Sequence, residues 1–436
     1  MPINHSYSHR KVYIVDGMRT PFIKAKGKPG PFSAADLAVS AAKPLLARQP
    51  FSPEVLDEVV VGCVSPSEEE ANIARIIALR LGCGPKVPGF SVQRNCASGL
   101  QAPLSAFQNI ALGKQDLVLA GGTESMSRTP LLYSKEMTQW FAELNTAKHW
   151  SAKLKTLVKF RPQFLVPVIA LLKGLTDPVV NLNMGQTAQE LAYRFNISRD
   201  EMDQFAVESH LKAEAAYQAH LMSEVTPLYD TKGQVYIKDD GIRPDSSTHK
   251  LSKLRPVFEK FGTVTAGNSS QVTDGAAFII LASEEAVKKY HLSPLAVIKD
   301  YHWAALEPEI MGLGPVHAMT PLLTRNELSL KDIDQLEINE AFAAQVIACQ
   351  RAWESDSYCK EKLGLNQAMG MITPQQLNPE GGAVALGHPV GASGARLLMH
   401  CALMLKQKNQ HRALASLCIG GGQGGAILIE REVNAL

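Results

Sequence analysis

The chain has 436 residues, of which 45% are hydrophobic and 20% charged, and its formal net charge is +2. This composition is typical of a soluble globular protein, and the length predicts two or three domains at about 150 residues each. The near-neutral charge gives no argument for nucleic-acid binding, and no run of 18 apolar residues is present that could span a membrane.

The cysteines and the start of the chain indicate a compartment. The seven cysteines are scattered, and no two have the C-x-x-C spacing of a zinc site or a redox dithiol. A disulfide framework is not expected in a chain of this length. Residues 1–10 are polar and lack the apolar segment of a signal peptide. We therefore expect a reducing, cytoplasmic location.

Strand-like and helical segments alternate along the first part of the chain. Ser33 is a plausible N-cap for the first helix. The alternation predicts a parallel sheet covered by helices on both faces. Strands are expected at 11–16, 59–62, 89–93 and 116–122, and helices at 34–46, 72–81 and 100–112.

The segment 128–183 interrupts this alternation. It has eight basic and three acidic residues, a net charge of +5, and it carries Trp140, Trp150 and several phenylalanines. A basic, amphipathic, aromatic segment can bind a membrane surface or a partner protein. A helical excursion folded over the main body is an equally good interpretation. The apolar run 164–172 is too short to span a bilayer.

The second half of the chain repeats the pattern of the first. After helices at 187–195 and 199–219, the latter with a capping box of Ser198 and Glu201, a strand is expected at 276–281. Further strands follow at 295–301, 333–338 and 413–418, with a helix at 395–406. Cys96-Ala97-Ser98-Gly99 and Gly391-Ala392-Ser393-Gly394 each open an apolar helix that leads to a strand ending in glycines. We interpret this as a duplicated α/β unit whose helix starts meet at a shared interface.

Cys96 lies between a predicted strand and the start of a predicted helix. The free N–H groups and the dipole at a helix start favour the thiolate, which is the nucleophilic form of cysteine. The alternative is a buried structural thiol, since free cysteines are among the most buried residues.

Three residues of the second half could assist a nucleophilic cysteine. His388 precedes a helix start in a glycine-rich loop, Cys418 ends a strand before Gly420-Gly421-Gly422, and Asn339 follows the strand 333–338. Taken singly, each has an ordinary interpretation: a satisfied loop histidine, a core cysteine, and a helix N-cap.

Together these motifs resemble the thiolase family over nearly the whole chain. One motif alone would be weak evidence, but five in the family's order are a strong signal. They are Asn95-Cys96-Ala97-Ser98-Gly99, Gly121-Gly122-Thr123-Glu124-Ser125-Met126-Ser127, Asn339-Glu340-Ala341-Phe342-Ala343, Gly387-His388-Pro389-Val390-Gly391-Ala392-Ser393-Gly394 and Cys418-Ile419-Gly420-Gly421-Gly422.

The resemblance implies an α/β thiolase fold, in which two βαβαβαββ halves form a five-layer αβαβα arrangement. We expect an N-terminal half at 1–127 with 255–290, a loop domain with the helical insert at 128–254, and a C-terminal half at 291–436.

The resemblance also implies roles for matching residues. Cys96 would carry the acyl group as a thioester, His388 would take the thiol proton, and Cys418 would be the second acid/base. One oxyanion site would use His388 and a water held by Asn339, and the other the backbone N–H groups of Cys96 and Gly420. For CoA, the family match places Ser270 at the pantetheine arm and Met184 in the lining of the site.

The function implied is that of a 3-ketoacyl-CoA thiolase of fatty-acid β-oxidation, an acyltransferase that uses CoA as a substrate and needs no cofactor or metal. The same site could condense two acetyl-CoA, as an acetyl-CoA C-acetyltransferase does. A ketoacyl synthase would typically carry a second histidine in place of Cys418. A non-catalytic lipid-binding or scaffold protein would not need Cys96, Asn339, His388 and Cys418 together.

One departure from the family pattern and one resemblance bear on the CoA loop and on partners. Asn183 stands where many small-substrate thiolases carry histidine, and the insert resembles that of the β-subunits of the fatty-acid oxidation trifunctional complex, especially at 148–162. Those β-subunits often carry histidine at the position of Asn339. The resemblance also implies a homodimer or homotetramer, since the family is usually dimeric or tetrameric. We expect the insert 128–183 to contact either the α-subunit of such a complex or, peripherally, a membrane.

Overall fold

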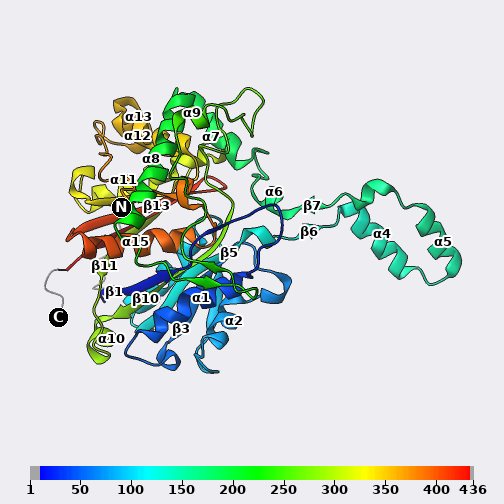
Figure 1. Cartoon of the computed structure of the whole chain (residues 1–436), viewed down its shortest axis with the longest axis horizontal. Coiled ribbons are helices and arrows are strands. Elements are labelled where there is room, and N and C mark those ends of the chain that lie inside the picture. The colour runs from blue at the N-terminus through cyan, green and yellow to red at the C-terminus, as the bar shows by residue number, and fades with distance from the viewer. Residues whose placement is uncertain (1–9, 433–436) are drawn as a thin grey trace.

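The computed structural model describes residues 10–432, so the predicted polar start, apart from Arg10, lies outside the described residues. A ten-stranded sheet runs through the molecule in the order β12-β13-β14-β11-β1-β10-β5-β3-β4, with the short β2 (Ile23–Lys24) paired to β10 (Figure 1). Its strands are β1 (Val12–Arg19), β3 (Glu58–Gly62), β4 (Gly89–Val92), β5 (Leu117–Ser125), β10 (Thr273–Ser283), β11 (Ala296–Ala305), β12 (Gln335–Ile338), β13 (Arg412–Ile419) and β14 (Gln423–Glu430).

The strand pairing repeats in the two halves. β3 is parallel to β5, and β10 then pairs antiparallel with both β5 and β1. In the second half β12 is parallel to β13, and β14 pairs antiparallel with both β13 and β11. A short β1–β11 pairing joins the halves. The predicted duplication is therefore seen, but the prediction of a parallel sheet is wrong, because the last strands of each half return in the opposite direction.

Helices form three layers around the two halves of the sheet. The helices α3 and α15 lie between the halves and pack on each other, and buried side chains from both sheet halves surround them. One outer face is covered by α1 and α2, and the other by α11 and α12. This confirms the five-layer thiolase fold. The helices are α1 (Ala34–Ala47), α2 (Ile73–Arg80), α3 (Ser98–Ala111), α11 (Gly314–Arg325), α12 (Ala343–Glu354) and α15 (Ser393–Gln407).

The loop region between β5 and β10 contains α7 (Met184–Arg194) and α8 (Arg199–Gln218). Ser198 caps α8 with the predicted capping box to Glu201. Asn183, the residue that departs from the family pattern, caps α7, since its side chain accepts a hydrogen bond from the Gln186 backbone N–H. The asparagine is therefore explained locally as a helix start. The division into three domains stays a prediction.

The insert forms an arm that projects from the body (Figure 1). Its stalk is a two-stranded ribbon of β6 (Leu131–Leu132) and β7 (Val168–Ile169), and its tip is a helical hairpin of α4 (Lys135–Thr146) and α5 (Trp150–Val158). Trp140 joins the two helices by donating to the Thr156 carbonyl and by packing edge-on against Phe160. The interpretation of a helical excursion folded over the body is therefore wrong. Among the described residues, no helix is long and apolar enough to cross a membrane.

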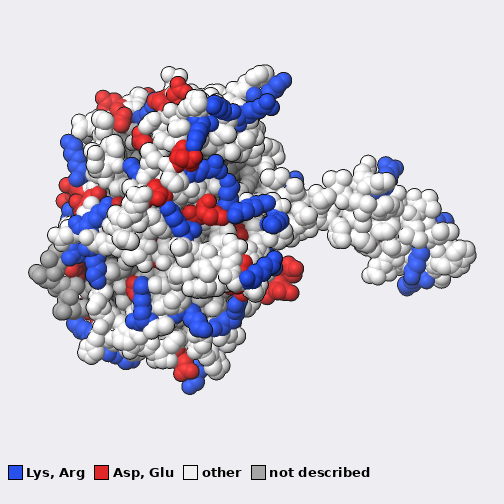
Figure 2. Space-filling model, in the orientation of Figure 1, with Lys and Arg blue, Asp and Glu red and all other residues white. Residues whose placement is uncertain are grey.

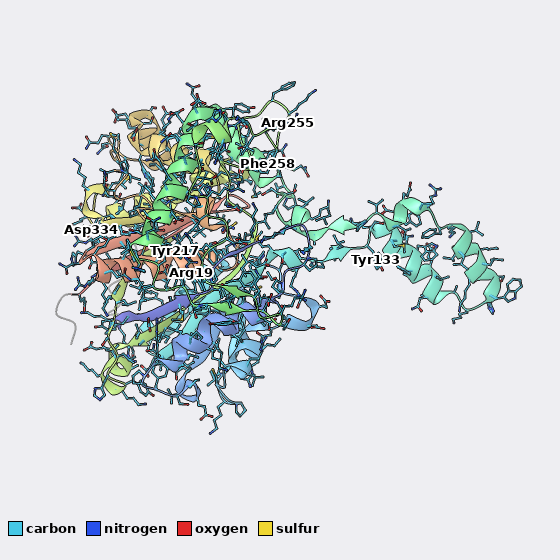
Figure 3. The ribbon with its side chains drawn as sticks, viewed as in Figure 1. Arg19, Tyr133, Tyr217, Arg255, Phe258 and Asp334 are labelled. Carbon is cyan, nitrogen blue, oxygen red and sulfur yellow. The ribbon has the colours of Figure 1, made fainter. Side chains whose placement is uncertain are left out.

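A buried network of charges ties the loop region to both halves. Arg19 at the end of β1 donates to both carboxylate oxygens of Asp239, at 2.7 and 2.9 Å, and Tyr217 of α8 donates to the same carboxylate (Figure 3). Arg19 also lies 3.5 Å from Glu224, which faces His400 of α15 at 3.1 Å.

His400 is positively charged in this network. Burial alone would lower its pKa, but Glu224 and Glu380 raise it to about 9. Burial would likewise raise the pKa of Glu224, but His400 and Arg19 lower it to about 2. Lys408 and Arg396 supply further positive charge to Glu380 and Glu337. Because these ions lie out of water, removing one partner leaves another charge buried and unpaired.

This network predicts a pH-dependent stability. The folded-state pKa of His400 lies above the unfolded value near 6.5. The charged histidine therefore stabilises the fold fully below pH 6.5, and this contribution is lost as the pH rises through 9. The wild type should therefore lose up to about 1.4 kcal/mol per pH unit in this window from His400 alone. Replacement His400→Gln should lower stability at pH 7 and flatten the slope. Urea unfolding between pH 6.5 and 9 measures both.

The matched control is His411→Gln, which changes an exposed histidine outside the network. It should keep the wild-type slope. An unchanged slope in the His400 variant would contradict a charged His400.

Candidate active site

A left-handed turn sets the position of Cys96. Asn95 has φ +45°, a conformation that asparagine tolerates better than most residues. Its side-chain amide donates to the Gly420 carbonyl at 2.8 Å, which ties the loop before α3 to the turn after β13. The Ser98 hydroxyl donates to the Asn95 carbonyl at 2.7 Å and accepts from the Arg94 N–H at 2.9 Å. Cys96 is held half-buried by these contacts.

Two opposing effects act on the Cys96 thiol, because backbone donors near the helix start favour the thiolate and burial disfavours it. Burial raises the pKa of the Cys96 thiol, although the Gly420 N–H and its own backbone N–H act to lower it. Cys96 lies two residues before α3, and desolvation of the anion outweighs the donors at the helix start. The thiol therefore needs a base.

His388 is the base that the site offers. It follows Gly387, whose φ of +102° turns the chain, and the imidazole is 7% exposed. Its Nδ1 lies 2.6 Å from the Ser393 hydroxyl, which donates to the Pro389 carbonyl at 3.1 Å. With the Ser393 hydroxyl donating to Pro389, the arrangement favours the tautomer that carries the proton on Nδ1 and leaves Nε2 as an acceptor. Burial lowers the pKa of His388 to about 4, so the ring is neutral near pH 7.

Asn339 and Cys418 come from neighbouring strand ends. The Asn339 side-chain amide lies 3.4 Å from Nε2 of His388, and its backbone N–H donates to Ser416 of β13. The interpretation of Asn339 as a helix N-cap is wrong, because α12 begins only at Ala343, after Phe342. Cys418 is buried near the end of β13, and burial and the neighbouring Cys96 raise its thiol pKa well above the usual value.

Two cavities meet at Cys96. One, of about 500 Å³, is lined by Cys96, His388 and Cys418 together with Ser270 and Met184. The other, of about 470 Å³, is lined by Cys96, Gly420 and Met184. Asn339 lines neither cavity but contacts His388. The structure therefore brings all seven predicted site residues together.

The sequence also contained functional positions without an assigned role. The Ser393 hydroxyl lies 2.6 Å from Nδ1 of His388, and the five-residue spacing of the two within the glycine-rich motif was the available signal. Glu124 lines the 470 Å³ cavity beside Cys96. Part of this cavity's apolar wall comes from α6 (Ala170–Gly174) and from Leu175, at the base of the arm. No sequence pattern indicated that the insert would reach the cavity.

Comparisons with known proteins agree with this geometry. The thiolase N-terminal domain model matches residues 12–285 and the thiolase C-terminal domain model matches 292–431. The chain is 38% identical over 426 residues to the human mitochondrial 3-ketoacyl-CoA thiolase, covering 97% of this chain and 98% of that protein. It is 36% identical over 423 residues to the bovine mitochondrial trifunctional enzyme subunit beta, covering 97% and 88%.

A solved structure shows the same architecture. The crystal structure of the human mitochondrial 3-ketoacyl-CoA thiolase matches with a TM-score of 0.83 and 36% identity, covering 98% of this chain and all of that one.

These comparisons contradict the predicted cytoplasmic location. Both relatives named above are mitochondrial proteins rather than cytoplasmic ones. Unpaired cysteines speak against an oxidising compartment but do not distinguish among reducing ones, so this prediction rested on a signal that could not decide it.

The predicted family, fold and class of enzyme are confirmed. Two family models together cover nearly the whole chain, and a relative of matching length is more than a third identical. The chain therefore belongs to the thiolase family of acyltransferases.

Proposed function

We propose that this enzyme cleaves 3-ketoacyl-CoA with CoA to acetyl-CoA and a shortened acyl-CoA, through an acyl group carried on Cys96. The observation that carries the proposal is the hydrogen-bond chain from His388 through Ser393 to Pro389. It leaves Nε2 of a neutral imidazole free to take a proton in the cavity that Cys96 lines. A nucleophile and an oriented base are the parts that covalent acyl transfer requires.

In the first half-reaction Cys96 gives its proton to Nε2 of His388 and attacks the 3-keto carbon. The Cα–Cβ bond of the substrate breaks, and the acetyl-CoA carbanion takes a proton from Cys418. The raised pKa of the Cys418 thiol keeps that proton available. The resulting state holds an acyl thioester on Cys96, a protonated His388 and a Cys418 thiolate.

In the second half-reaction the Cys418 thiolate takes the proton of the CoA thiol. The CoA thiolate attacks the acyl thioester, and the departing Cys96 thiolate recovers its proton from His388. The amide of Asn339 and the N–H of Gly420 each stabilise one of the two oxyanions that form. Each residue thereby returns to its starting protonation state.

CoA would enter through the 500 Å³ cavity. Ser270 and Met184 line it together with Val257 and Phe258. Phe258 and the nearby Arg255 are labelled in Figure 3. The same loop carries the basic residues Lys253, Arg255 and Lys260, which suit the phosphates of CoA.

A role in fatty-acid β-oxidation is supported by the second cavity. Its 470 Å³ adjoins Cys96 and has apolar walls from α6 and Val179, which suit an acyl chain longer than acetoacetyl. The alternative is net condensation of two acetyl-CoA. The same residues would catalyse that direction.

Replacement Cys96→Ala tests the proposal. The wild type should consume acetoacetyl-CoA and longer 3-ketoacyl-CoA only when CoA is present, and the variant should be slower by more than about a thousandfold, since no other group carries the acyl chain. The control Cys83→Ala changes a buried cysteine outside both cavities and should stay active. No turnover of any chain length by folded wild type would exclude the proposed function.

Replacement Ser393→Ala tests the role of the tautomer. Without the hydroxyl, His388 loses the partner that keeps the proton on Nδ1, and kcat should fall roughly 10- to 100-fold while KM stays near the wild-type value. Steady-state kinetics measures both constants.

The control Ser283→Ala removes the cap of α10 (Glu284–Lys289), remote from the cavities, at a cost of about 1 kcal/mol of stability. It should leave kcat unchanged. A Ser393→Ala enzyme with full activity would show that the hydrogen bond does not orient the base.

We also propose that the arm binds an anionic membrane surface. Trp150, Leu154, Leu157 and Val158 share one face of α5, and Trp150 and Val158 are 79% and 80% exposed. Lys153 and Lys155 of the same helix lie to either side of this face, whereas Lys159 forms an ion pair with Glu143 at 3.1 Å. Figure 2 shows the arm as a mostly uncharged surface with scattered basic side chains. Exposed apolar residues beside lysines suit anionic headgroups.

The triple replacement Trp150→Ser, Leu154→Ser and Val158→Ser tests this surface. Wild type should sediment with phosphatidylglycerol vesicles and less so in high salt, while the triple variant should remain in the supernatant with normal thiolysis. Tyr229→Ser with Met371→Ser, which alters exposed apolar residues of the body, serves as the control. Failure of the wild type to bind would overturn the proposal and favour a partner subunit as the occupant.

A homo-oligomer is supported by the edge of the sheet. β4 is the last strand in the order, its one strand partner within residues 10–432 is β3, and its residues are partly exposed. An edge strand of this kind can pair with the same strand of a second copy.

A further inference from the structure

Glu124 is a buried carboxyl in the wall of the cavity that Cys96 lines. It lies near the end of β5 and is 1% exposed. The backbone N–H groups of Val64 and Ser65 both donate to it at 2.9 Å, and the Cys63 thiol lies 3.7 Å away. These donors all come from the loop that follows β3, so Glu124 holds that loop against the end of β5.

The same carboxyl faces the loop that carries His388. A Cβ atom at Gly391 would lie 2.6 Å from a Glu124 carboxylate oxygen, so the Gly391 backbone passes directly over the carboxyl. The Gly391 N–H also lowers the pKa of Glu124. One side chain therefore contacts the loop after β3, which belongs to the first half, and the His388 loop, which belongs to the second.

The groups around Glu124 allow its negative charge to affect the pKa of the Cys96 thiol. Within the described residues no lysine or arginine forms an ion pair with it, and its titratable neighbours are the thiols of Cys63 and Cys96. Burial raises the pKa of Glu124 to about 7, although the backbone donors act to lower it. Its negative charge in turn raises the pKa of the Cys96 thiol.

We propose that Glu124 is a positioning residue for the thiolase reaction, which clamps the loop after β3 to the His388 loop and sets how readily Cys96 gives up its proton. This inference rests on the proposed role of Cys96 as the acyl carrier. The ionised carboxylate accepts the backbone donors and fixes the distance between base and nucleophile. Loss of the charge favours the Cys96 thiolate, and loss of the acceptor loosens the loops.

Replacement Glu124→Gln tests both effects together, because glutamine keeps the shape but removes the charge and one acceptor. We expect kcat for thiolysis to fall between about 10- and 100-fold with KM little changed, since misplacement affects the reacting groups more than binding. The pH profile of Cys96 alkylation by iodoacetamide, followed by mass spectrometry of the Cys96 peptide, should move to lower pH.

Two further variants keep the test decisive. Glu70→Gln alters another buried carboxylate that accepts a backbone N–H, from Ala35 at 2.9 Å, but it lies outside both cavities and should change neither kcat nor the alkylation profile. Glu124→Asp keeps the charge and shortens the reach. It should lower kcat without moving the alkylation profile, and it therefore tests the clamp between the loops separately from the charge.

The outcomes are distinguishable. Unchanged alkylation profiles in the folded Glu124→Gln enzyme, with kcat also unchanged, would overturn the proposal, and loss of thermal stability alone would show a purely structural role. Absence of thiolysis in the wild type would defeat the proposed function, whereas the alkylation profile would still test the link between Glu124 and Cys96.

Discussion

The structure depends on a close backbone contact between its two halves. Gly99 at the start of α3 packs against Gly391 before α15, and a Cβ atom at Gly99 would lie 2.5 Å from the Gly391 carbonyl oxygen. Gly122 of β5 meets the same carbonyl. Side chains at these positions would force α3 and α15 apart. Because the helices can approach so closely, Cys96 of one half lines the same cavity as His388 of the other.

Burial then decides the chemistry of the site. The interface that brings the residues together also removes water, so the thiols of Cys96 and Cys418 hold their protons and His388 stays neutral. A resting thiolate would need no base. A neutral thiol beside a neutral imidazole needs a fixed tautomer, and the hydrogen bond from His388 to Ser393 supplies it. The same burial gives Glu124 a pKa near neutrality and couples it to the nucleophile.

The parts of the fold that follow from local pattern could be predicted from the sequence. The strands before Cys96 and Asn339 and the helix at Ser198 depend on apolar spacing and caps, and they lie close to the predicted bounds. Strand direction could not be predicted, because β10 returns to the sheet only after the long loop region. The position of the arm could not be predicted either, because the apolar face of a helix shows the same residue spacing whether the helix packs on the body or projects away from it. Glu124 belongs to one of the family motifs, but a role for it can be inferred only once the loops that it contacts are known.

The most direct test of the account is the mass of the Cys96 peptide after the enzyme meets a 3-ketoacyl-CoA without free CoA. The first half-reaction should then leave the shortened acyl group on Cys96 and release acetyl-CoA. We expect this thioester in the wild type and a strong reduction in a His388→Gln variant, because the thiol would lack its base. An acyl group on another cysteine, or equal labelling in both proteins, would contradict the claim that the interface between the halves makes Cys96 and His388 one catalytic unit.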